Sequence, residues 1–250
     1  MIWISWIFAE QHDSGSVTVM SLLLCLILWT APMMPKVDKA HGLRQHVAIL
    51  SGCCVLGVSF GTSLRNNTSH ATFMSLFCYF HFSEFVLISF SHGRCTFDSL
   101  LLNHGFQYAG AFSLSLAEIH FAPLGLPSVC QNIGLGMALI GLLIRALALL
   151  TAGRAFTHLI SDRKSLDHSL VQRGIYQYMR HPGYCGWLIW VTSSQILAGN
   201  PICATVFCLI SWSFFKDRIE YEESLLVNMF GSEYTKYRSR VTLSGIPFID

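Results

Sequence analysis

Charged residues are scarce in this chain. Only 12% of its 250 residues are Asp, Glu, Lys or Arg, whereas soluble globular domains carry about a quarter, and 52% are hydrophobic. No basic tract of the kind that nucleic-acid binding needs is present, and the net charge of +2 indicates no class of partner. The nine cysteines form no CxxC pair and no His/Cys ligand spacing, so neither a metal site nor a disulfide framework is supported. The composition indicates a membrane protein.

Long hydrophobic runs predict membrane-spanning helices. Runs of about 20 residues lie at 16–33, 45–63, 70–91, 99–120 and 129–152. Two shorter runs, 187–198 and 202–215, flank a Gly-Asn-Pro turn and predict a helical hairpin over 184–215. Residues 1–9 are too short to span and lack a basic n-region, so an interfacial or partial helix is expected there. The predicted fold is an all-α, multi-pass transmembrane helical bundle of seven to eight segments.

Lys and Arg predict the orientation of this bundle. If the C-terminus is cytosolic, all of the 16 Lys and Arg residues except Arg65 and Arg145 fall in cytosolic segments, as the positive-inside rule requires. The composition changes at Gly153, where transmembrane helices give way to a polar segment. We therefore predict two regions, the N-terminal transmembrane helices at 1–152 and a cytosol-facing catalytic region at 153–250.

A seven-residue motif stands where the polar segment meets the first arm of the hairpin: Arg180-His181-Pro182-Gly183-Tyr184-Cys185-Gly186. Because a hairpin returns to the side from which it starts, we predict that His181 and Tyr184 lie near Arg218 and Glu222, which follow the second arm. Pro182 is predicted in the first turn of a helix, where its missing N–H costs nothing. This meeting point at the membrane edge is the candidate active site.

Two interpretations of the motif remain open at this stage. In the first, His181 stands at a helix N-terminus whose free N–H groups bind anions, while Gly183 and Gly186 let the backbone approach a ligand. In the second, the motif is a loop entering a membrane helix, and Arg180 and His181 meet lipid headgroups. The sequence pattern alone favours neither.

Arg218 and Glu222 stand four residues apart on one helix face. They form either a simple ion pair, worth about 0.3–0.5 kcal/mol, or two separate functional groups. The base precedes the acid, which is the less favourable order for a helical ion pair. A guanidinium fork is suited to binding a carboxylate at two points, so Arg218 is the predicted catalytic and substrate-binding residue.

These motifs resemble the C-terminal signature of the integral-membrane methyltransferases. The matching segments are Arg180-His181-Pro182-x-Tyr184-x-Gly186, the short hairpin, Arg218-x-Glu220-x-Glu222-Glu223, Gly231-x-x-Tyr234-x-x-Tyr237 and the ending Gly245-Ile246-Pro247-Phe248-Ile249. Within this superfamily the chain most resembles the isoprenylcysteine carboxyl methyltransferases of the eukaryotic endoplasmic reticulum.

The resemblance implies a reaction and a place in the cell. It implies S-adenosyl-L-methionine as methyl donor, with S-adenosyl-L-homocysteine as product, and the C-terminal carboxylate of a farnesylated or geranylgeranylated cysteine as acceptor. The acceptors would be prenylated, CaaX-processed proteins such as small GTPases, reached through membrane lipid. The resemblance also implies an endoplasmic reticulum membrane enzyme whose site faces the cytosol, and a monomer carries all the residues required.

The resemblance also assigns residues to the cofactor. By their match to the family's motifs, they are His168, Ser169, Leu170, Val171, Tyr176, His181, Pro182, Gly183, Tyr184 and Glu222. Ser161 departs from the family pattern, because relatives carry Gln just upstream of the cofactor stretch, and a cofactor contact there is in doubt. An ionised carboxylate acceptor needs no general base, so alignment with the donor methyl group and removal of water are the main tasks of the site.

Three alternative functions remain. A phospholipid N-methyltransferase shares the donor, but its amine acceptor leaves Arg218 without a carboxylate to bind. A sterol-reductase-like enzyme has a similar C-terminal half but uses NADPH and is longer at its N-terminus. A non-enzymatic transporter or scaffold leaves the clustered His, Tyr, Arg and Glu unexplained.

Charged residues inside the predicted spans form a separate question. Intramembrane charge is costly and usually faces the interior of a bundle. We predict that Arg145 pairs with Glu118 or Glu84 and fixes the geometry of the bundle. Alternatively, these residues line the path of the acceptor.

Overall fold

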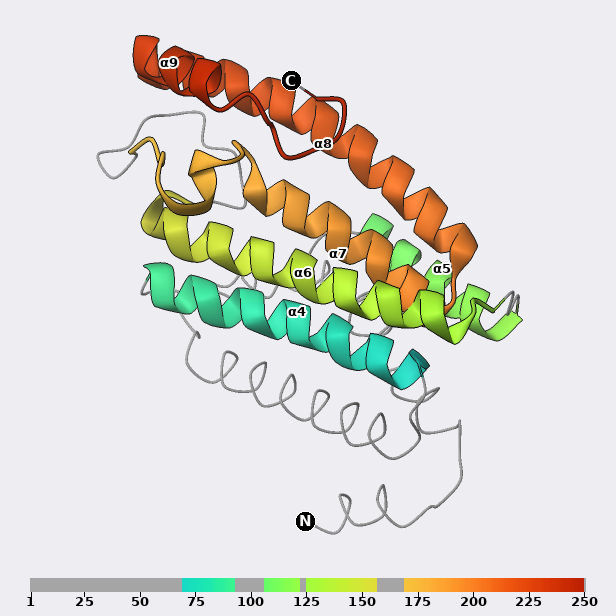
Figure 1. Cartoon of the computed structure of the whole chain (residues 1–250). Helices are drawn as coiled ribbons and strands as arrows, with labels where there is room; N and C mark the ends of the chain where they lie inside the picture. Colours follow the sequence, from blue (N-terminus) through green and yellow to red (C-terminus); the bar gives the residue numbers. More distant parts are fainter. Residues whose placement is uncertain (1–68, 93–105, 122–124, 157–168, 250) are drawn as a thin grey trace. The chain divides into compact units, whose positions relative to one another are not determined.

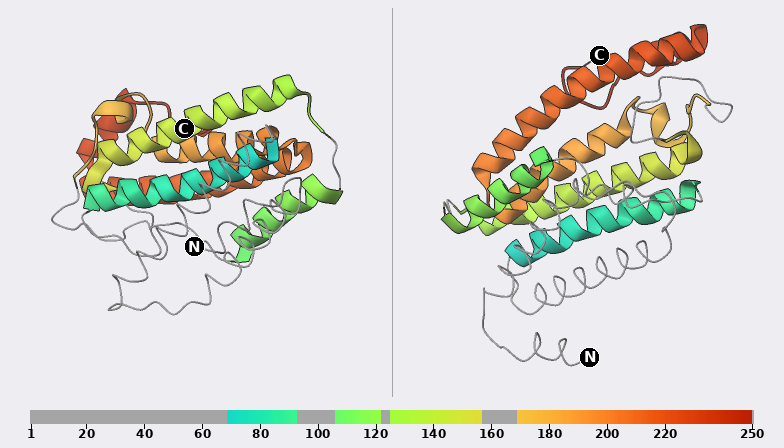
Figure 2. Two further views of the ribbon diagram at one scale, coloured as in Figure 1. Left: turned by 90° about the horizontal axis from the view of Figure 1, so that it is seen from below. Right: turned by 180° about the vertical axis from the view of Figure 1, so that it is seen from behind.

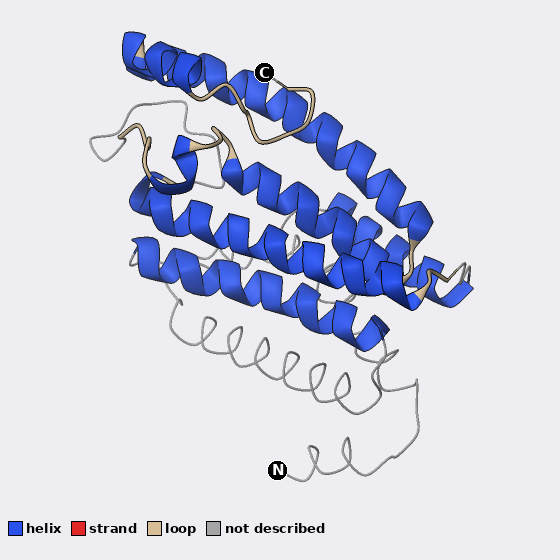
Figure 3. Ribbon diagram, viewed as in Figure 1, coloured by secondary structure: helices blue, strands red, loops and turns tan. Residues whose placement is uncertain are grey.

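The structure, a computed structural model, describes residues 69–92, 106–121, 125–156 and 169–249 (Figure 1). All regular secondary structure in these ranges is helical, which confirms the predicted all-α class for this part of the chain (Figure 3). The predicted spans at 16–33 and 45–63 and the expected helix at 1–9 lie outside the described residues. The total of seven to eight segments therefore stays a prediction.

The chain divides into two compact units. The first contains residues 69–82 of α4 (Ser69–His92) together with α5 (Phe106–Phe121). Its core is aromatic: the rings of Phe77 and Phe112 lie 4.5 Å apart between centroids. On the same two helices, His81 Nε2 and the Tyr108 hydroxyl are hydrogen-bonded at 2.8 Å. Helices were predicted at 70–91 and 99–120, and α4 and the described part of the second run confirm them.

The second unit carries the motifs singled out in the sequence. Besides the end of α4, it contains α6 (Ser128–Ala152), η3 (Gly153–Ala155), η4 (Gly174–Gln177), α7 (Pro182–Ala198), α8 (Pro201–Phe230) and α9 (Ser232–Arg240). Within this unit α7 lies between α6 and α8 (Figures 1 and 2). Among the described helices, the segment Ser128–Ala155 is long and apolar enough to cross a membrane.

Glycines set the close packing of α6 against α7. A Cβ placed on Gly186 would lie 2.6 Å from the carbonyl oxygen of Gly141 and 2.7 Å from the backbone nitrogen of Arg145. A Cβ on Gly141 would lie 2.7 Å from the backbone nitrogen of Trp190. Gly186 was predicted to admit a ligand, but the structure uses it to bring two helix backbones together.

The hairpin turn is confirmed. Helix α7 ends at Ala198, and Gly199 follows in the left-handed region at φ 80°, which glycine adopts without strain. The buried Asn200 donates from Nδ2 to Gln195 Oε1 at 3.0 Å, and Pro201 opens α8. The chain thus turns directly from α7 into α8.

Helix α8 is longer than the hydrophobic run that begins it. The second arm was expected at 202–215, whereas α8 has 30 residues and ends only at Gly231, whose φ is 54°. At about 1.5 Å per residue it is ~45 Å long. The charged stretch after Phe215 contains good helix formers and no Gly or Pro, so nothing ends the helix there. The charged residues therefore project as a rigid extension of the apolar arm.

The C-terminal residues 241–249 run back over the start of α7. The backbone N–H of Arg180 donates to the Leu243 carbonyl at 2.9 Å, and that of His181 donates to Ser244 at 2.7 Å. The tail is anchored by an apolar cluster that joins α7, α8 and the tail: Leu188, Phe215, Ile219, Ile246 and Ile249. The tail fixes the position of the motif backbone.

Candidate active site

The motif turn is buried and stands at the N-terminus of α7. Pro182 occupies the first helical turn, as predicted, and His181 is the preceding cap residue. Arg180 and His181 are only 5% and 6% exposed. The interpretation in which these two side chains meet lipid headgroups is therefore wrong.

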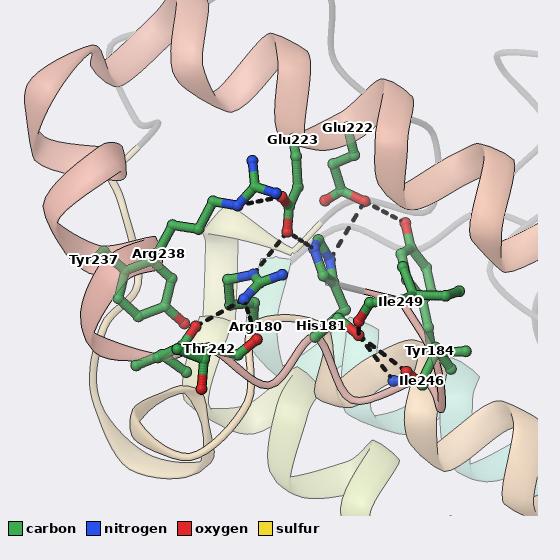
Figure 4. A network of polar contacts seen from close by, with 12 residues as sticks. Arg180, His181, Tyr184, Glu222, Glu223, Tyr237, Arg238, Thr242, Ile246 and Ile249 are labelled. Atoms are coloured by element: carbon green, nitrogen blue, oxygen red, sulfur yellow. Dashed lines mark hydrogen bonds and ion pairs between the residues drawn. The ribbon is translucent and has the colours of Figure 1, made fainter.

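Glu223 of α8 receives hydrogen bonds from several directions (Figure 4). Its Oε1 accepts from Arg180 Nε at 2.7 Å and from His181 Nε2 at 3.1 Å. Its Oε2 pairs with Arg238 Nε of α9 at 3.2 Å. Arg180 also donates from Nη1 to the backbone carbonyls of the tail residues Val241 and Thr242. One carboxylate therefore joins α7, α8 and α9, and through Arg180 the tail.

The charge state of Glu223 follows from these bonds. Burial alone would raise the pKa of its carboxyl group, but the hydrogen bonds from His181 and Arg180 outweigh burial and lower the pKa to about 2. Glu223 is therefore ionised at neutral pH and can only accept hydrogen bonds. It follows that His181 carries a proton on Nε2, and that its Nδ1 faces the other side of the site.

Glu222 organises that other, more open side. Its Oε2 accepts from the Tyr184 hydroxyl at 2.6 Å and lies 3.9 Å from His181 Nδ1. The Tyr184 hydroxyl in turn accepts from Arg218 Nε at 2.8 Å. The rings of His181 and Tyr184 are stacked, with centroids 5.6 Å apart and an interplanar angle of 8°. The side chain of Glu222 is 29% exposed, so its carboxylate can be reached from solution.

The structure thus confirms that the hairpin brings His181 and Tyr184 to Arg218 and Glu222. Gly183 has a different neighbour: its carbonyl accepts from Arg145 Nη1 of α6 at 2.9 Å. Of the predicted cofactor residues, His181, Pro182, Gly183 and Tyr184 therefore form one continuous turn, in which the Gly183 carbonyl faces α6.

The upstream part of the predicted cofactor stretch reaches the same region. Burial and, after it, the negative charge of Glu222 raise the pKa of Tyr176. Tyr237 of α9 donates from its hydroxyl to the Tyr176 carbonyl at 2.7 Å. Leu170 packs on the cluster of Tyr234, Tyr237 and Val241, Val171 is partly buried and Ser169 is exposed. His168 and Ser161 lie outside the described residues.

The buried arginine of α6 has a carboxylate partner. Arg145 donates from Nε to Glu84 Oε1 at 2.7 Å and from Nη2 to Glu84 Oε2 at 3.0 Å. Of the two carboxylates considered from the sequence, the structure selects Glu84. The link from this pair to the Gly183 carbonyl was not predicted, because a backbone acceptor leaves no mark in the sequence.

Sequence reasoning also missed the structural role of Glu223. Its signal was present, since Glu223 is the second acid of the matched Glu222-Glu223 pair. Adjacent residues on a helix point about 100° apart, so one acid can face the buried turn while the other faces Tyr184. Arg238 and the tail carbonyls carried no such signal.

The residues at this site suit a methyl donor that carries a sulfonium. The partly exposed carboxylate of Glu222 is hydrogen-bonded to Tyr184, whose aromatic ring stacks on that of His181. Aromatic faces and carboxylates both attract a cation. These side chains therefore fit the positively charged S-adenosylmethionine, and Glu222 and Tyr184 are the residues that would hold it.

Known proteins resemble the chain over most of its length. Residues 134–228 match the isoprenylcysteine carboxyl methyltransferase family. A protein-S-isoprenylcysteine O-methyltransferase of Tribolium castaneum is 40% identical over 220 residues, covering 85% of this chain and 78% of the relative. The protein of that name from Mus musculus is 36% identical and covers 96% of both chains, and form B from Arabidopsis thaliana is 43% identical, covering 69% and 89%.

A solved structure has the same fold. It is described as the eukaryotic intramembrane Ras methyltransferase ICMT, an isoprenylcysteine carboxyl methyltransferase. The two chains superpose with a TM-score of 0.68 at 30% identity, covering 96% of this chain and 99% of the other. Sequence and structure thus point to the same relatives.

Proposed function

Because the chain belongs to the isoprenylcysteine carboxyl methyltransferase family, we infer that it is a membrane enzyme that methylates the C-terminal carboxylate of prenylated cysteine. The observation that carries this assignment in the site itself is the position of Arg218. Its guanidinium follows the apolar part of α8 and donates to the Tyr184 hydroxyl. That hydroxyl donates to Glu222, which in turn lies 3.9 Å from His181. A phospholipid amine or a sterol gives this guanidinium no carboxylate to bind.

S-adenosylmethionine is the proposed donor, and S-adenosylhomocysteine is the product that leaves. When bound, the donor supplies a methyl group already activated by the sulfonium. The proposed cofactor residues are His168, Ser169, Leu170, Val171, Tyr176, His181, Pro182, Gly183, Tyr184 and Glu222. Within this set, Glu222 is proposed to bind a polar part of the donor, and the aromatic rings to stabilise its positive charge.

The acceptor needs orientation more than activation. A C-terminal carboxyl group with a reference pKa of about 3.5 is ionised at pH 7, so no side chain has to remove a proton. Arg218 would hold the acceptor carboxylate by charge-assisted hydrogen bonds and so restrict its orientation. Holding two reactants in line is worth roughly 7–11 kcal/mol. The buried surroundings of the turn exclude water from the pair.

The membrane supplies the acceptor. Each buried CH₂ of a prenyl chain is worth about 0.8 kcal/mol, so farnesylated and geranylgeranylated proteins arrive already in the lipid. We propose that the enzyme lies in the endoplasmic reticulum membrane with its site facing the cytosol, acts on CaaX-processed proteins such as small GTPases, and needs no second subunit. The acceptor then enters sideways from the membrane, while the donor enters from the cytosol.

A methyl-transfer assay tests the assignment. Purified protein in lipid nanodiscs is mixed with labelled methyl donor and either farnesylcysteine or phosphatidylethanolamine. We expect label in the farnesylcysteine ester, and label in phosphatidylethanolamine alone would overturn the assignment.

A substitution at Arg218 tests the role of the guanidinium. Arg218→Lys keeps the charge but loses the fork, so kcat/KM for farnesylcysteine should fall about 10- to 100-fold. The affinity for S-adenosylhomocysteine, measured by calorimetry, should stay within about twofold, because the fork acts on the acceptor. The matched control is Arg240→Lys on α9, which is exposed and bonds Gln172 on the surface. Unchanged turnover in Arg218→Lys would remove Arg218 from the reaction.

A further inference from the structure

We propose that the Tyr184 hydroxyl is a positioning group that sets the orientation of Arg218 for the acceptor carboxylate. The proposal rests on the function proposed above and assigns the hydroxyl to the acceptor side of the reaction. The ring of Tyr184 keeps its place among the donor residues. Three observations carry the assignment: the direction of two hydrogen bonds, the packing of the ring, and the spacing of Arg218 and Glu222 on α8.

The two hydrogen bonds at the hydroxyl have only one possible direction. A guanidinium has no acceptor, so the 2.8 Å contact from Arg218 Nε must be donated to the Tyr184 oxygen. The single hydroxyl proton is then used in the 2.6 Å bond to Glu222 Oε2. The hydroxyl therefore joins guanidinium to carboxylate in a fixed order, with no proton left for another acceptor.

Packing fixes the position of the hydroxyl. The Tyr184 ring stacks on His181 at 5.6 Å and on Phe215 of α8 at 4.9 Å, with interplanar angles of 8° and 21°. His181 is itself held by the buried Glu223. The Arg218 guanidinium carbon lies 5.5 Å from the centroid of the same tyrosine ring and 5.9 Å from that of Phe214. A flexible arginine is thus held against a rigid aromatic support.

The spacing of Arg218 and Glu222 on α8 explains what the hydroxyl between them does. Arg218 and Glu222 stand four residues apart, where a guanidinium and a carboxylate attract each other directly. With the hydroxyl between Nε and Oε2, the tyrosine shares that attraction and fixes how Arg218 is turned. Without the hydroxyl, Arg218 is drawn toward Glu222. Its positive charge is then partly neutralised by that carboxylate and attracts an incoming carboxylate less strongly.

Tyr184→Phe removes the hydroxyl and keeps the stacked ring. We expect kcat/KM for farnesylcysteine to fall about tenfold, mainly through KM, because the hydrogen bond that holds the Arg218 guanidinium is lost. The affinity for S-adenosylhomocysteine should change less than twofold. Tyr178→Phe is the matched control, because Tyr178 is 71% exposed and lies outside the site.

A double-mutant cycle separates coupling from a general loss. In an Arg218→Lys background, Tyr184→Phe should cost less than twofold, because the group that it positions is already lost. Additive losses, or a tenfold loss of S-adenosylhomocysteine affinity with an unchanged acceptor KM, would overturn the proposal.

A binding measurement keeps this test independent of methyl transfer. Wild-type protein should bind farnesylcysteine more tightly than its methyl ester, and Tyr184→Phe should reduce that preference at least fivefold. A wild type with no preference contradicts the proposed function. A full preference retained in Tyr184→Phe contradicts the role of the hydroxyl alone.

Discussion

The motif turn at the start of α7 is held from two sides, and the two sides use charge differently. On the α6 side, Arg145 forms a two-point pair with Glu84 and donates from Nη1 to the Gly183 carbonyl. On the α8 side, three guanidiniums, those of Arg180, Arg218 and Arg238, face the two carboxylates Glu222 and Glu223. The side chains of the α6 pair are only 6% and 2% exposed, whereas on the α8 side those of Glu222 and Arg238 are 29% and 46% exposed.

The difference separates architecture from chemistry. A buried guanidinium needs a carboxylate partner, since an unmatched charge in a low-dielectric interior costs several kcal/mol. A guanidinium close to water can accept a new anionic partner at a smaller desolvation cost, and its charge attracts an anionic acceptor. The α6 side therefore holds the turn in place, and the α8 side is where an ionised carboxylate can bind. Three substitutions test this division.

The largest effect is expected at Glu84. Glu84→Gln leaves Arg145 buried at 5% exposure without its countercharge, which should lower the free energy of unfolding by about 3–5 kcal/mol. The measurement is thermal unfolding in detergent, followed by intrinsic fluorescence. Replacing both partners, in Glu84→Met with Arg145→Met, should recover most of that stability. A single Glu84→Gln variant as stable as wild type would show that the pair does not hold the fold.

A smaller, pH-dependent effect is expected at Glu223. Its pKa is lowered from 4.5 to about 2, so its contribution to stability is fully present above pH 4.5 and is lost as the pH falls toward 2. The full contribution is about 3 kcal/mol. Unfolding free energies measured between pH 7 and pH 3 should therefore decline in wild type and decline less in Glu223→Gln. Glu220→Gln, at an exposed position of the same helix, is the control and should follow wild type. Identical slopes in Glu223→Gln and wild type would exclude this carboxylate as the cause.

Much of the candidate active site was predictable from the sequence, because local sequence rules determine it. Gly199 and Pro201 punctuate the chain, Pro182 starts a helix, and a hairpin returns to its starting side, so the meeting of His181 with Glu222 followed. Helical structure was predicted both for the arm at 202–215 and for the stretch with Arg218 and Glu222, but the sequence did not show that the two form one unbroken helix. Only a glycine, at Gly231, ends that helix.

The interior was less predictable, because its contacts depend on how helices align. Glu84 and Glu118 both lie in apolar spans, and no local pattern says which of them faces Arg145. The tail binds the motif through backbone carbonyls of Leu243 and Ser244, which any residue provides. Gly186 was predicted to let a ligand approach, because a glycine in a functional motif can serve either ligand binding or close helix packing.

The smallest of the three effects tests that glycine. Gly186→Ala places a methyl group 2.6 Å from the Gly141 carbonyl oxygen and 2.7 Å from the Arg145 nitrogen, both rigid backbone atoms, so α6 and α7 must separate. Overpacking of this kind costs about 1–3 kcal/mol. Gly136 lies on the neighbouring helix α6, and a methyl group added there has nothing within 4 Å. Gly136→Ala should therefore gain up to about 1 kcal/mol of stability from helix propensity. Because the separation also moves Arg145 away from the Gly183 carbonyl, Gly186→Ala should weaken S-adenosylhomocysteine binding as well as stability. A variant that loses stability but keeps full affinity would mean that the α8 side alone fixes the motif turn.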